Sequence, residues 1–549
     1  MFISIVLDVE YMGMPSRKMW YLKNLLHCKE NGWILITHDY IRKHFDELQE
    51  SVNDRFFEQF EMRKFTIDEV KDVEQYYIPD SIFEDKEKSF GSRTEMLSDL
   101  YNHNDSKLDI CLNDIIEQIK IKHPNETIEG VFNMLESYES IRSFAKKLNT
   151  QLLNYSFAAF RKPHGYRQTL YQVSTNGYYW GDEDAKKHYA KFIKENADVP
   201  VFSNQELITI IGKERTLPEI KLIGAEPKYE MGVCCECFSM VPQVFETTHY
   251  TDDDIFYECK KLYSPDQFKV RSHAAHLNDI QVDRNEVHND PASTILSSKR
   301  VTAVQSQIIL KALLWKRPAI MRKEALAFSF MCSKDYTSLE IADIKALNYF
   351  IFGFLIPSEL MFSDEYWKWR NTNPSETEIY KKHLTFLFNT LGIPKAILNM
   401  PANSERFRAL LISRNADEQL ISELVDSDII PSVNWDVATS RFDVFTAAGK
   451  KSYWRLDTLN EDGSLTSLLD LNVAGITKVE FYPLDDVAGF ASIQKVEING
   501  EKQEFVEDFK YMAKTAGKFV FDVETSNKHL IINCTWKYRK INEHLNSLQ

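Results

Sequence analysis

Side chains that can bind a phosphate group follow two strand-like segments of this sequence. The segment QFKVRSHA carries Arg271 and His273 at its end. About thirty residues later, KRVTAV is followed by Ser306, which opens a helical pattern, and by Gln307. Ligands of parallel α/β sheets bind at the carboxyl ends of the strands. A helix N-terminus offers unpaired N–H groups to an anion, and the Arg, His and Ser side chains add further donors. The pattern predicts a phosphate held between two adjacent loops. A helix-capping role for Ser306, with His273 a solvated loop residue, stays equally open.

Length and composition indicate a folded chain with several domains. The 549 residues are 44% hydrophobic and 13% aromatic, which provides large apolar side chains for more than one core. At ~150 residues per domain, the length predicts roughly three to four domains. The net charge of −15 argues against nucleic acid or an anionic membrane as a bulk partner.

Neither a metal centre nor a membrane span is expected. Cys234, Cys235 and Cys237 lack the paired spacing of zinc ligands, so buried thiols are the favoured interpretation, and reduced thiols suit the cytosol. Asp8 and Glu10 interrupt the N-terminal apolar run, unlike in a signal peptide. The longest apolar run, ALNYFIFGFLI, is about half of the ~20 residues that a membrane helix requires.

Alternating strand and helix patterns predict two α/β units, then a helical segment and a β-sandwich that could serve in binding. The expected divisions are residues 1–215, 216–345, 346–432 and 433–549. The expected strands are FISIVLD and WILITHDY in the first unit, and KLIGA, VCCECF, QFKVRSHA, KRVTAV and RPAIM in the second. The expected helices are LDICLNDIIEQIKIK, TIEGVFNMLESYESIRSFAKKL, TDDDIFYECKKLY and SQIILKALLW.

Three local signals define element boundaries. Thr251 precedes three acidic residues and is expected as a helix N-cap. Ser375 and Glu378 have the spacing of a capping box. Asn499-Gly500, between KVEI and EKQEF, is the strongest short hairpin signal in the chain.

A long acid-free run stands out in this acidic chain. No Asp or Glu occurs from Ser140 to Gly181. The basic residues of this run are Arg142, Lys146, Lys147, Arg161, Lys162 and Arg167. Such a bias suits a phosphorylated or acidic acceptor, such as a lipid-linked glycan near a membrane face. An ordinary solvated helix followed by a loop is the alternative.

The stretch from VRSHA to ALLWKRPAI resembles the C-terminal domain of GT-B glycosyltransferases that build capsules and lipopolysaccharides. The family in question is the bacterial Kdo transferases and, more distantly, the bacterial sialyltransferases. Kdo is an acidic eight-carbon sugar carried on CMP. The matching positions are Arg271, His273, Ser306, Ala312, Leu313, Leu314 and Pro318. Further likeness lies in FRKPHGYRQTLYQVSTNGYYWGDED and FSDEYWKWRNTNPSETEIYKKHL, so most of residues 150–390 is covered.

The sequence departs from the family pattern at several positions. Ala274 replaces the second residue of the His-Pro pair, and Lys316 replaces a glycine. The family's Glu-Asp-Gly run reads SFAAF here. The Asp nucleophile of the retaining Kdo transferases is absent from CCECFSMVPQVFETTHY, where Glu236 is the first-choice carboxylate and Glu246 the second. A structural role for Glu236 remains the alternative.

The resemblance implies an α/β fold with a GT-B-like pair of Rossmann-like domains and a function in bacterial surface polysaccharide synthesis. A sugar, Kdo from CMP-Kdo in the first instance, would pass to a glycan or glycolipid acceptor, with no cofactor and no metal. Arg271, His273, Ser306 and Gln307 would bind the nucleotide phosphate, and Glu236 and His273 would act in catalysis. Arg161, Lys162 and Arg167 would face the acceptor. The implied location is cytoplasmic, at most peripheral at the inner face of the membrane. A catalytically inactive carbohydrate-binding or assembly protein is the alternative.

Overall fold

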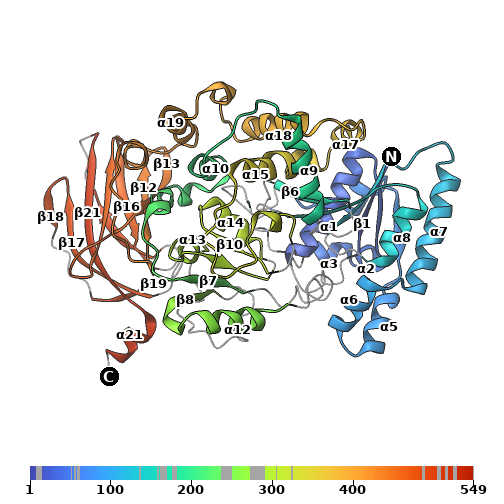
Figure 1. Ribbon diagram of the computed structural model, residues 1–549, viewed down its shortest axis with the longest axis horizontal. Coiled ribbons are helices and arrows are strands. Elements are labelled where there is room, and N and C mark those ends of the chain that lie inside the picture. Colours follow the sequence, from blue (N-terminus) through green and yellow to red (C-terminus); the bar gives the residue numbers. More distant parts are fainter. Residues whose placement is uncertain are drawn as a thin grey trace.

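The computed structural model is elongated, with a parallel sheet near the N-terminus at one end and antiparallel sheets near the C-terminus at the other (Figure 1). The structure describes residues 1–7, 15–50, 52, 54, 57, 62–134, 138–157, 160, 170–175, 182–235, 250–271, 291–304, 306–322, 326–484, 489–503, 508–512, 517–523 and 528–547.

A seven-stranded sheet organises the N-terminal part of the chain. Its parallel strands, in spatial order, are β3 (Gln75–Ile78), β2 (Ile34–His38), β1 (Phe2–Val6), β4 (Gly130–Met134) and β5 (Leu152–Phe157). β6 (Leu170–Ser174) and then β11 (Ile356–Pro357) extend the β5 edge in antiparallel fashion. Every residue of β1, β2 and β4 is buried, as expected for parallel strands with helices on both faces.

Helices cover both faces of this sheet. Ile3, Ile34 and Val131 pack on one face against α5 (Ser81–Phe90), α6 (Arg93–Asn102), α7 (Ser106–Lys122) and α8 (Glu139–Lys147). Phe2, Leu35 and Phe132 point to the other face, where α1 (Pro15–Asn31) supplies Trp20 and Leu22. The other helices that the structure describes up to residue 216 are α2 (Asp39–Lys43), α3 (Phe45–Glu50), η1 (Ile67–Val70), α9 (Asp182–Glu195), α10 (Asn204–Ile211) and η2 (Glu214–Thr216).

The single helix expected over residues 127–148 is wrong. The structure divides this stretch into strand β4 and helix α8, with Tyr138 as the residue before the helix. A short, fully buried apolar run cannot be assigned to helix or strand from its periodicity. Here parallel pairing with both β1 and β5 makes it a central strand.

The second sheet has four parallel strands in the order β10-β9-β7-β8. They are β7 (Met231–Cys234), β8 (Phe268–Arg271), β9 (Val301–Thr302) and β10 (Ala319–Ile320), and their helices are α12 (Asp252–Leu262), α13 (Pro291–Leu296) and α14 (Ile308–Leu314). Thr251 caps α12 as expected, because its side chain accepts from the Asp254 N–H. The strand expected at KLIGA is wrong: this stretch belongs to the 3₁₀ helix η3 (Pro218–Gly224), where Pro218 sets the first turn.

A mainly helical segment follows the second sheet. Its elements are η6 (Ser329–Met331), α15 (Ile344–Tyr349), η7 (Phe350–Phe354), α16 (Ser358–Met361), α17 (Asp364–Arg370), α18 (Glu376–Thr390), η8 (Lys395–Asn399), α19 (Ser404–Ser413), α20 (Glu418–Ile421) and η9 (Ser422–Asp426). The capping box of Ser375 and Glu378 at α18 is confirmed. The segment is not purely helical, since it contributes β11 to the first sheet.

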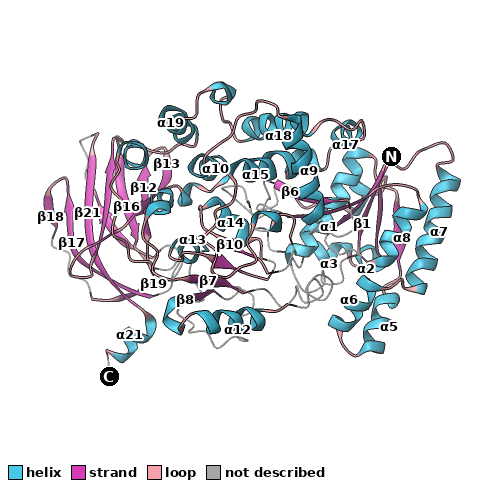
Figure 2. Cartoon of the chain, viewed as in Figure 1, coloured by secondary structure: helices cyan, strands magenta, loops and turns pink. Residues whose placement is uncertain are grey.

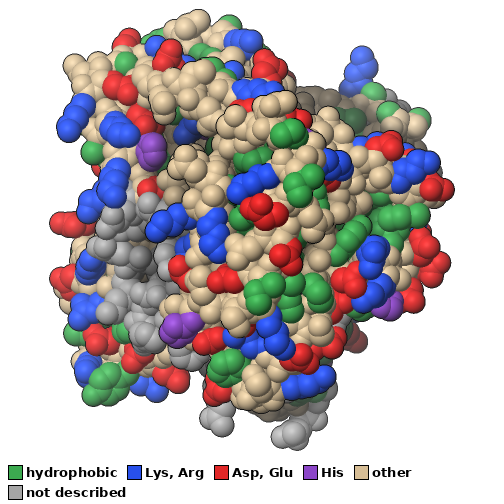
Figure 3. Space-filling view, turned by 90° about the vertical axis from the view of Figure 1, so that its right-hand side faces the viewer, with side chains coloured by type: hydrophobic (Ala, Val, Ile, Leu, Met, Phe, Trp, Pro, Cys, Tyr) green, Lys and Arg blue, Asp and Glu red, His purple; other side chains and the backbone are tan. Residues whose placement is uncertain are grey.

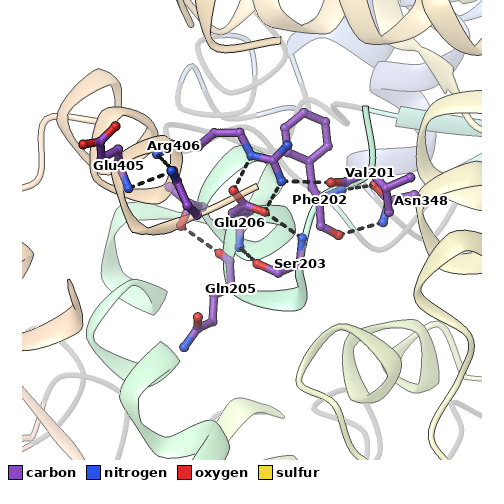
Figure 4. A network of polar contacts seen from close by, with 10 residues as sticks. Val201, Phe202, Ser203, Gln205, Glu206, Asn348, Glu405 and Arg406 are labelled. Carbon is purple, nitrogen blue, oxygen red and sulfur yellow. Dashed lines mark hydrogen bonds and ion pairs between the residues drawn. The ribbon is translucent and has the colours of Figure 1, made fainter. Parts of the chain in front are cut away.

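A buried polar network fastens this helical segment to the chain between the two sheets (Figure 4). The Arg406 guanidinium binds both carboxylate oxygens of Glu206, at 2.6 and 2.7 Å, and the Val201 carbonyl at 2.9 Å. The Asn348 amide exchanges two 2.8 Å hydrogen bonds with the Phe202 backbone. Both charged side chains are 4% exposed, so this pair is enclosed by protein.

The C-terminal part folds as two antiparallel sheets around one core (Figure 2). One sheet orders β13 (Gly449–Leu456), β12 (Thr439–Thr446), β16 (Ile476–Tyr482) and β20 (Phe519–Asp522). The other orders β14 (Thr458–Leu459), β15 (Leu465–Leu471), β21 (Leu530–Arg539), β17 (Gly489–Ile498) and β18 (Glu501–Gln503), with β19 (Lys510–Met512) also on β17 and α21 (Ile541–Asn546) at the end. The hairpin at Asn499-Gly500 is confirmed, and both residues have the positive φ that its tight turn requires.

Candidate functional site

Arg271 and Ser306 lie at the carboxyl edge of the second sheet. Arg271 is the last residue of β8, and its carbonyl accepts the Cys235 N–H at 2.9 Å. Ser306 comes shortly after the end of β9. The two strands are not neighbours, because β7 lies between them. The ends of β8 and β9 are therefore two strand spacings, or roughly 10 Å, apart. A ligand that meets both side chains must therefore span the end of β7, rather than sit between adjacent loops as the sequence suggested.

Ser306 and Gln307 precede helix α14, which begins at Ile308. The Ser306 Oγ is 3.5 Å from the Ile308 N–H, which is a weak capping contact. Gln307 occupies the N-cap position with no side-chain cap, and its Oε1 is buried without a hydrogen-bond partner among the described residues. Both side chains therefore keep hydrogen-bonding capacity at this edge.

Several expected site residues lie outside the described residues. These are Glu236, Glu246, His273, Arg161, Lys162 and Arg167. Their roles stay predictions from the sequence.

A buried histidine and two aspartates lie at the carboxyl edge of the first sheet, and the sequence reasoning missed them. His38 ends β2 and Asp39 follows it, while Asp80 comes just after β3. The His38 Nδ1 lies 3.9 Å from an Asp80 oxygen, and the same oxygen accepts the Tyr40 N–H at 3.0 Å. The rule applied to QFKVRSHA, polar side chains directly after a buried strand, would have found them in WILITHDY.

The pKa values of the two carboxyl groups in this cluster are shifted in opposite directions. Burial raises the pKa of Asp80, although the Tyr40 N–H and Lys43 oppose it. Burial also acts on Asp39, but its ion pairs with Lys43 and Arg42 outweigh this effect and lower its pKa. The surroundings therefore favour the protonated form of Asp80 and the ionised form of Asp39.

The acid-free run is only partly a free basic surface. Arg142 is paired with Glu139, just outside the run, at 2.6 Å, and Lys147 donates to Asn113 at 2.8 Å. A surface hollow of about 480 Å³ lies beside the run, lined by Arg142, Ala145, Lys146, Asn149, Thr150, Gln151, Leu152 and Thr175. It lies at the amino end of β5, opposite the edge where parallel sheets bind ligands.

Charge is mixed on the end of the molecule that carries the first sheet. In the view of Figure 3, acidic and basic side chains alternate across this face without a broad region of one sign. The net charge of the chain is therefore not concentrated there.

Cys234 and Cys235 are buried, in agreement with the favoured interpretation, and Cys237 lies outside the described residues. Among the described residues, no cluster of His, Cys, Asp and Glu has the arrangement of a metal site. The helices within the described ranges include none long and apolar enough to cross a membrane.

No protein-family model and no curated protein matches this chain. Partial structural similarity links it to two Thermosulfurimonas dismutans KpsC enzymes. The β-Kdo 2,4-transferase has 12% identity and a TM-score of 0.28, over 40% of this chain and 78% of that one. The β-Kdo 2,7-transferase has 12% identity and a TM-score of 0.27, over 45% and 87%.

The UDP-GlcNAc 2-epimerase of Methanocaldococcus jannaschii is also similar, with 12% identity and a TM-score of 0.23, over 63% of this chain and 92% of that one. Overlaps with such low TM-scores carry no conclusion about activity. The functional interpretation therefore depends on the residues of the chain itself.

Proposed function

We propose that this chain is a glycosyltransferase that takes a sugar from a nucleotide donor, with CMP-Kdo as the first candidate, and passes it to a glycan or glycolipid of a bacterial surface polysaccharide. Residues 1–215 and 216–345 would act as two Rossmann-like domains, with 346–432 packed on both. The observation that supports this most is the position of Arg271 and Ser306 on either side of β7 at one sheet edge.

In the proposed reaction the bond between the sugar anomeric carbon and the phosphate oxygen breaks, and its electron pair stays on the CMP phosphate. Arg271, Ser306, Gln307 and His273 would donate to the oxygens where this charge develops. Donors aimed at developing charge are typically worth a few kcal/mol each. Glu236 would take the proton of the acceptor hydroxyl as general base, or attack the sugar if configuration is retained.

Nucleotide binding is tested by thermal unfolding with increasing CMP, UDP and GDP. A ligand that binds the folded state raises the Tm by mass action. Arg271→Ala and His273→Ala should each remove most of the rise seen with CMP. Arg408→Ala, an exposed arginine of α19 paired with Asp426, is the matched control and should leave it intact. An equal rise in all variants would place the nucleotide elsewhere.

Catalysis is tested by transfer and hydrolysis assays with CMP-, UDP- and GDP-sugars. Glu236→Gln keeps the shape of the side chain but cannot accept a proton, so turnover should fall about 10²-fold or more while nucleotide binding persists. Glu246→Gln is the paired comparison. Full activity of the Glu236 variant would remove this residue from the chemistry.

The second candidate is a carbohydrate-binding or assembly protein with a transferase-like architecture. It is favoured by the absence of an Asp where the retaining Kdo transferases are expected to carry one. Nucleotide binding without turnover of any nucleotide sugar would support this candidate over the enzyme.

A further inference from the structure

The outer face of the sheet β13-β12-β16-β20 carries charged and aromatic side chains in ordered rows. Alternate residues of these strands, such as Phe442 and Phe481, pack into the sandwich core, so the residues between them lie on the opposite face. The pairing register aligns these as Trp454–Arg441–Tyr482, Ser452–Asp443–Glu480–Val520 and Lys450–Phe445–Lys478–Asp522.

Two buried carboxylates form the centre of this face. Asp443 is 1% exposed, and it accepts from the Ser452 hydroxyl at 2.6 Å and from the Lys450 ammonium at 3.0 Å. Arg441 lies 3.1 Å from the same carboxylate. Its position in the middle row makes Asp443 an anchor for the cations around it.

Glu480, directly opposite Asp443, anchors a second set of cations. It is 5% exposed, and one oxygen accepts from Lys478 at 2.9 Å and Lys518 at 2.6 Å. The other oxygen accepts from the Tyr482 hydroxyl at 2.9 Å. Burial opposes ionisation, but these three donors outweigh it and lower the pKa of Glu480 to about 2. The carboxylate therefore stays charged and holds both ammonium groups in place.

The lysines are fixed at their ends yet remain accessible. The side chains of Lys450, Lys478 and Lys518 are 50%, 37% and 44% exposed. Each ammonium has three N–H donors, and its carboxylate contact uses one. The remaining donors are available to a ligand whose binding need not first order a mobile side chain.

Aromatic rings accompany the cations. The Arg441 guanidinium lies 4.0 Å from the centre of the Tyr482 ring, and the Lys478 ammonium lies 4.1 Å from that of Phe445. Trp454 is half-buried beside Arg441. Phe445 and Trp454 are partly exposed and offer flat apolar surface to the C–H faces of a sugar, next to donors for its hydroxyl and carboxylate groups, whereas the Tyr482 ring is buried beneath Arg441.

The balance of charge on this face selects the ligand. Arg441, Lys450, Lys478 and Lys518 face Asp443, Glu480 and Asp522, a surplus of one positive charge in a chain whose net charge is −15. The two acids at the centre are buried, so the accessible charge is mostly cationic. The rest of the chain packs on β13 through η2 and η3 and on β15 through α20, and the lysines of this face remain exposed.

We propose that this face of the β-sandwich binds an acidic polysaccharide, one whose sugars carry carboxylate groups. The binding does not require that the chain transfer sugar. It would hold an acidic glycan on the molecule independently of any nucleotide.

The test is titration of the full chain, without nucleotide, with polysialic acid as the carboxylate-bearing probe and dextran as the neutral one. Polysialic acid should bind and dextran should not. Lys478→Ala and Lys450→Ala should each raise the Kd for polysialic acid about 5-fold or more. Lys478→Arg should keep most of the wild-type affinity, since the charge at the site is retained. Lys518 still holds Glu480 in the Lys478 variant, so the fold should persist, which circular dichroism and the Tm check.

Lys495→Ala is the matched control on the other sheet. Lys495 forms the same kind of contact with Glu497, at 2.7 Å, and is 47% exposed. Its removal should leave the Kd unchanged. The proposal is overturned if the wild type does not bind polysialic acid, if dextran binds equally, or if Lys495→Ala weakens binding as much as Lys478→Ala. The proposal is also overturned if heparin or DNA binds as tightly as polysialic acid and Trp454→Ala does not change the Kd of any of them. This result would mean that the face binds polyanions in general.

Discussion

Asp457 is a carboxyl group enclosed at one end of the sandwich core. Its side chain is fully buried, and one oxygen accepts from the Ser440 hydroxyl at 2.7 Å and from Ser467. Burial raises the pKa of Asp457 to about 8, although both serines oppose the shift. The folded state therefore retains a proton that the unfolded chain releases above its ordinary pKa of about 4.

We expect Asp457 to make the sandwich less stable as pH rises. Its contribution is fully present below about pH 4 and is lost progressively up to about pH 8, by at most about 1.4 kcal/mol per pH unit. Urea unfolding at pH 5, 7 and 9 would measure this effect, and Asp457→Asn, which cannot ionise, should remove it. The same pH dependence in both proteins would assign it to other groups.

The strand ends show how far residue types alone locate a site. The strand expected in QFKVRSHA is present as β8, over Phe268–Arg271, and the last three residues of the segment lie outside the described residues. The intervening β7, by contrast, separates β8 from β9 through pairings that join residues far apart in sequence. Spatial order in a sheet is therefore not readable from two isolated segments.

At the scale of elements, helix α19 is held by the buried pair of Arg406 and Glu206. Arg406→Ala leaves the Glu206 charge enclosed without its partner, so we expect a loss of about 3–5 kcal/mol in the free energy of unfolding. Arg408→Ala, on the same helix but exposed, should change stability little. Chemical denaturation of both variants makes the comparison. A similar small effect of the two substitutions would contradict an anchoring role for the pair.

The elements with an explicit boundary signal were all predicted correctly. Thr251 and the pair of Ser375 and Glu378 satisfy backbone groups of their own helices, and Asn499-Gly500 adopts the positive φ of a tight turn, so these structures depend little on the rest of the fold. Residues 127–148 have no such signal, and the conformation of β4 is set by its tertiary partners β1 and β5, which a local pattern does not contain. For KLIGA, the signal for a helix, Pro218, lies just before the segment.

At the scale of the molecule, Arg455 and Gln419 join the sandwich to the helical segment. The Arg455 side chain is 2% exposed, and it donates to Asp417 at 2.8 Å and to the Gln419 Oε1 at 3.0 Å. The same Gln419 oxygen accepts the Asp470 N–H at 2.9 Å. Helix α20 is thereby bonded to both sheets of the sandwich, at β13 and β15.

Arg455→Ala should uncouple the sandwich from the rest of the chain. Hydrogen bonds to charged groups contribute about 1.5–3 kcal/mol each, and the sandwich retains its own core. Scanning calorimetry should show a sandwich transition that moves to lower temperature and separates from the main one. A single, unshifted transition would mean that the two parts are held together elsewhere.

The first sheet cannot be completed until strand β11 has been synthesised. Ile356 pairs with Tyr171 on β6, so the edge of a sheet that begins at Phe2 is completed only after the whole second sheet has been made. At ~5–20 residues per second, the ribosome needs on the order of ten to forty seconds to make the stretch between β6 and β11. During this time β6 presents unpaired N–H and C=O groups, a template on which a strand of another nascent chain can pair. Self-association during translation is therefore a hazard built into the connectivity of this chain, and it ends when Ile356 and Pro357 arrive.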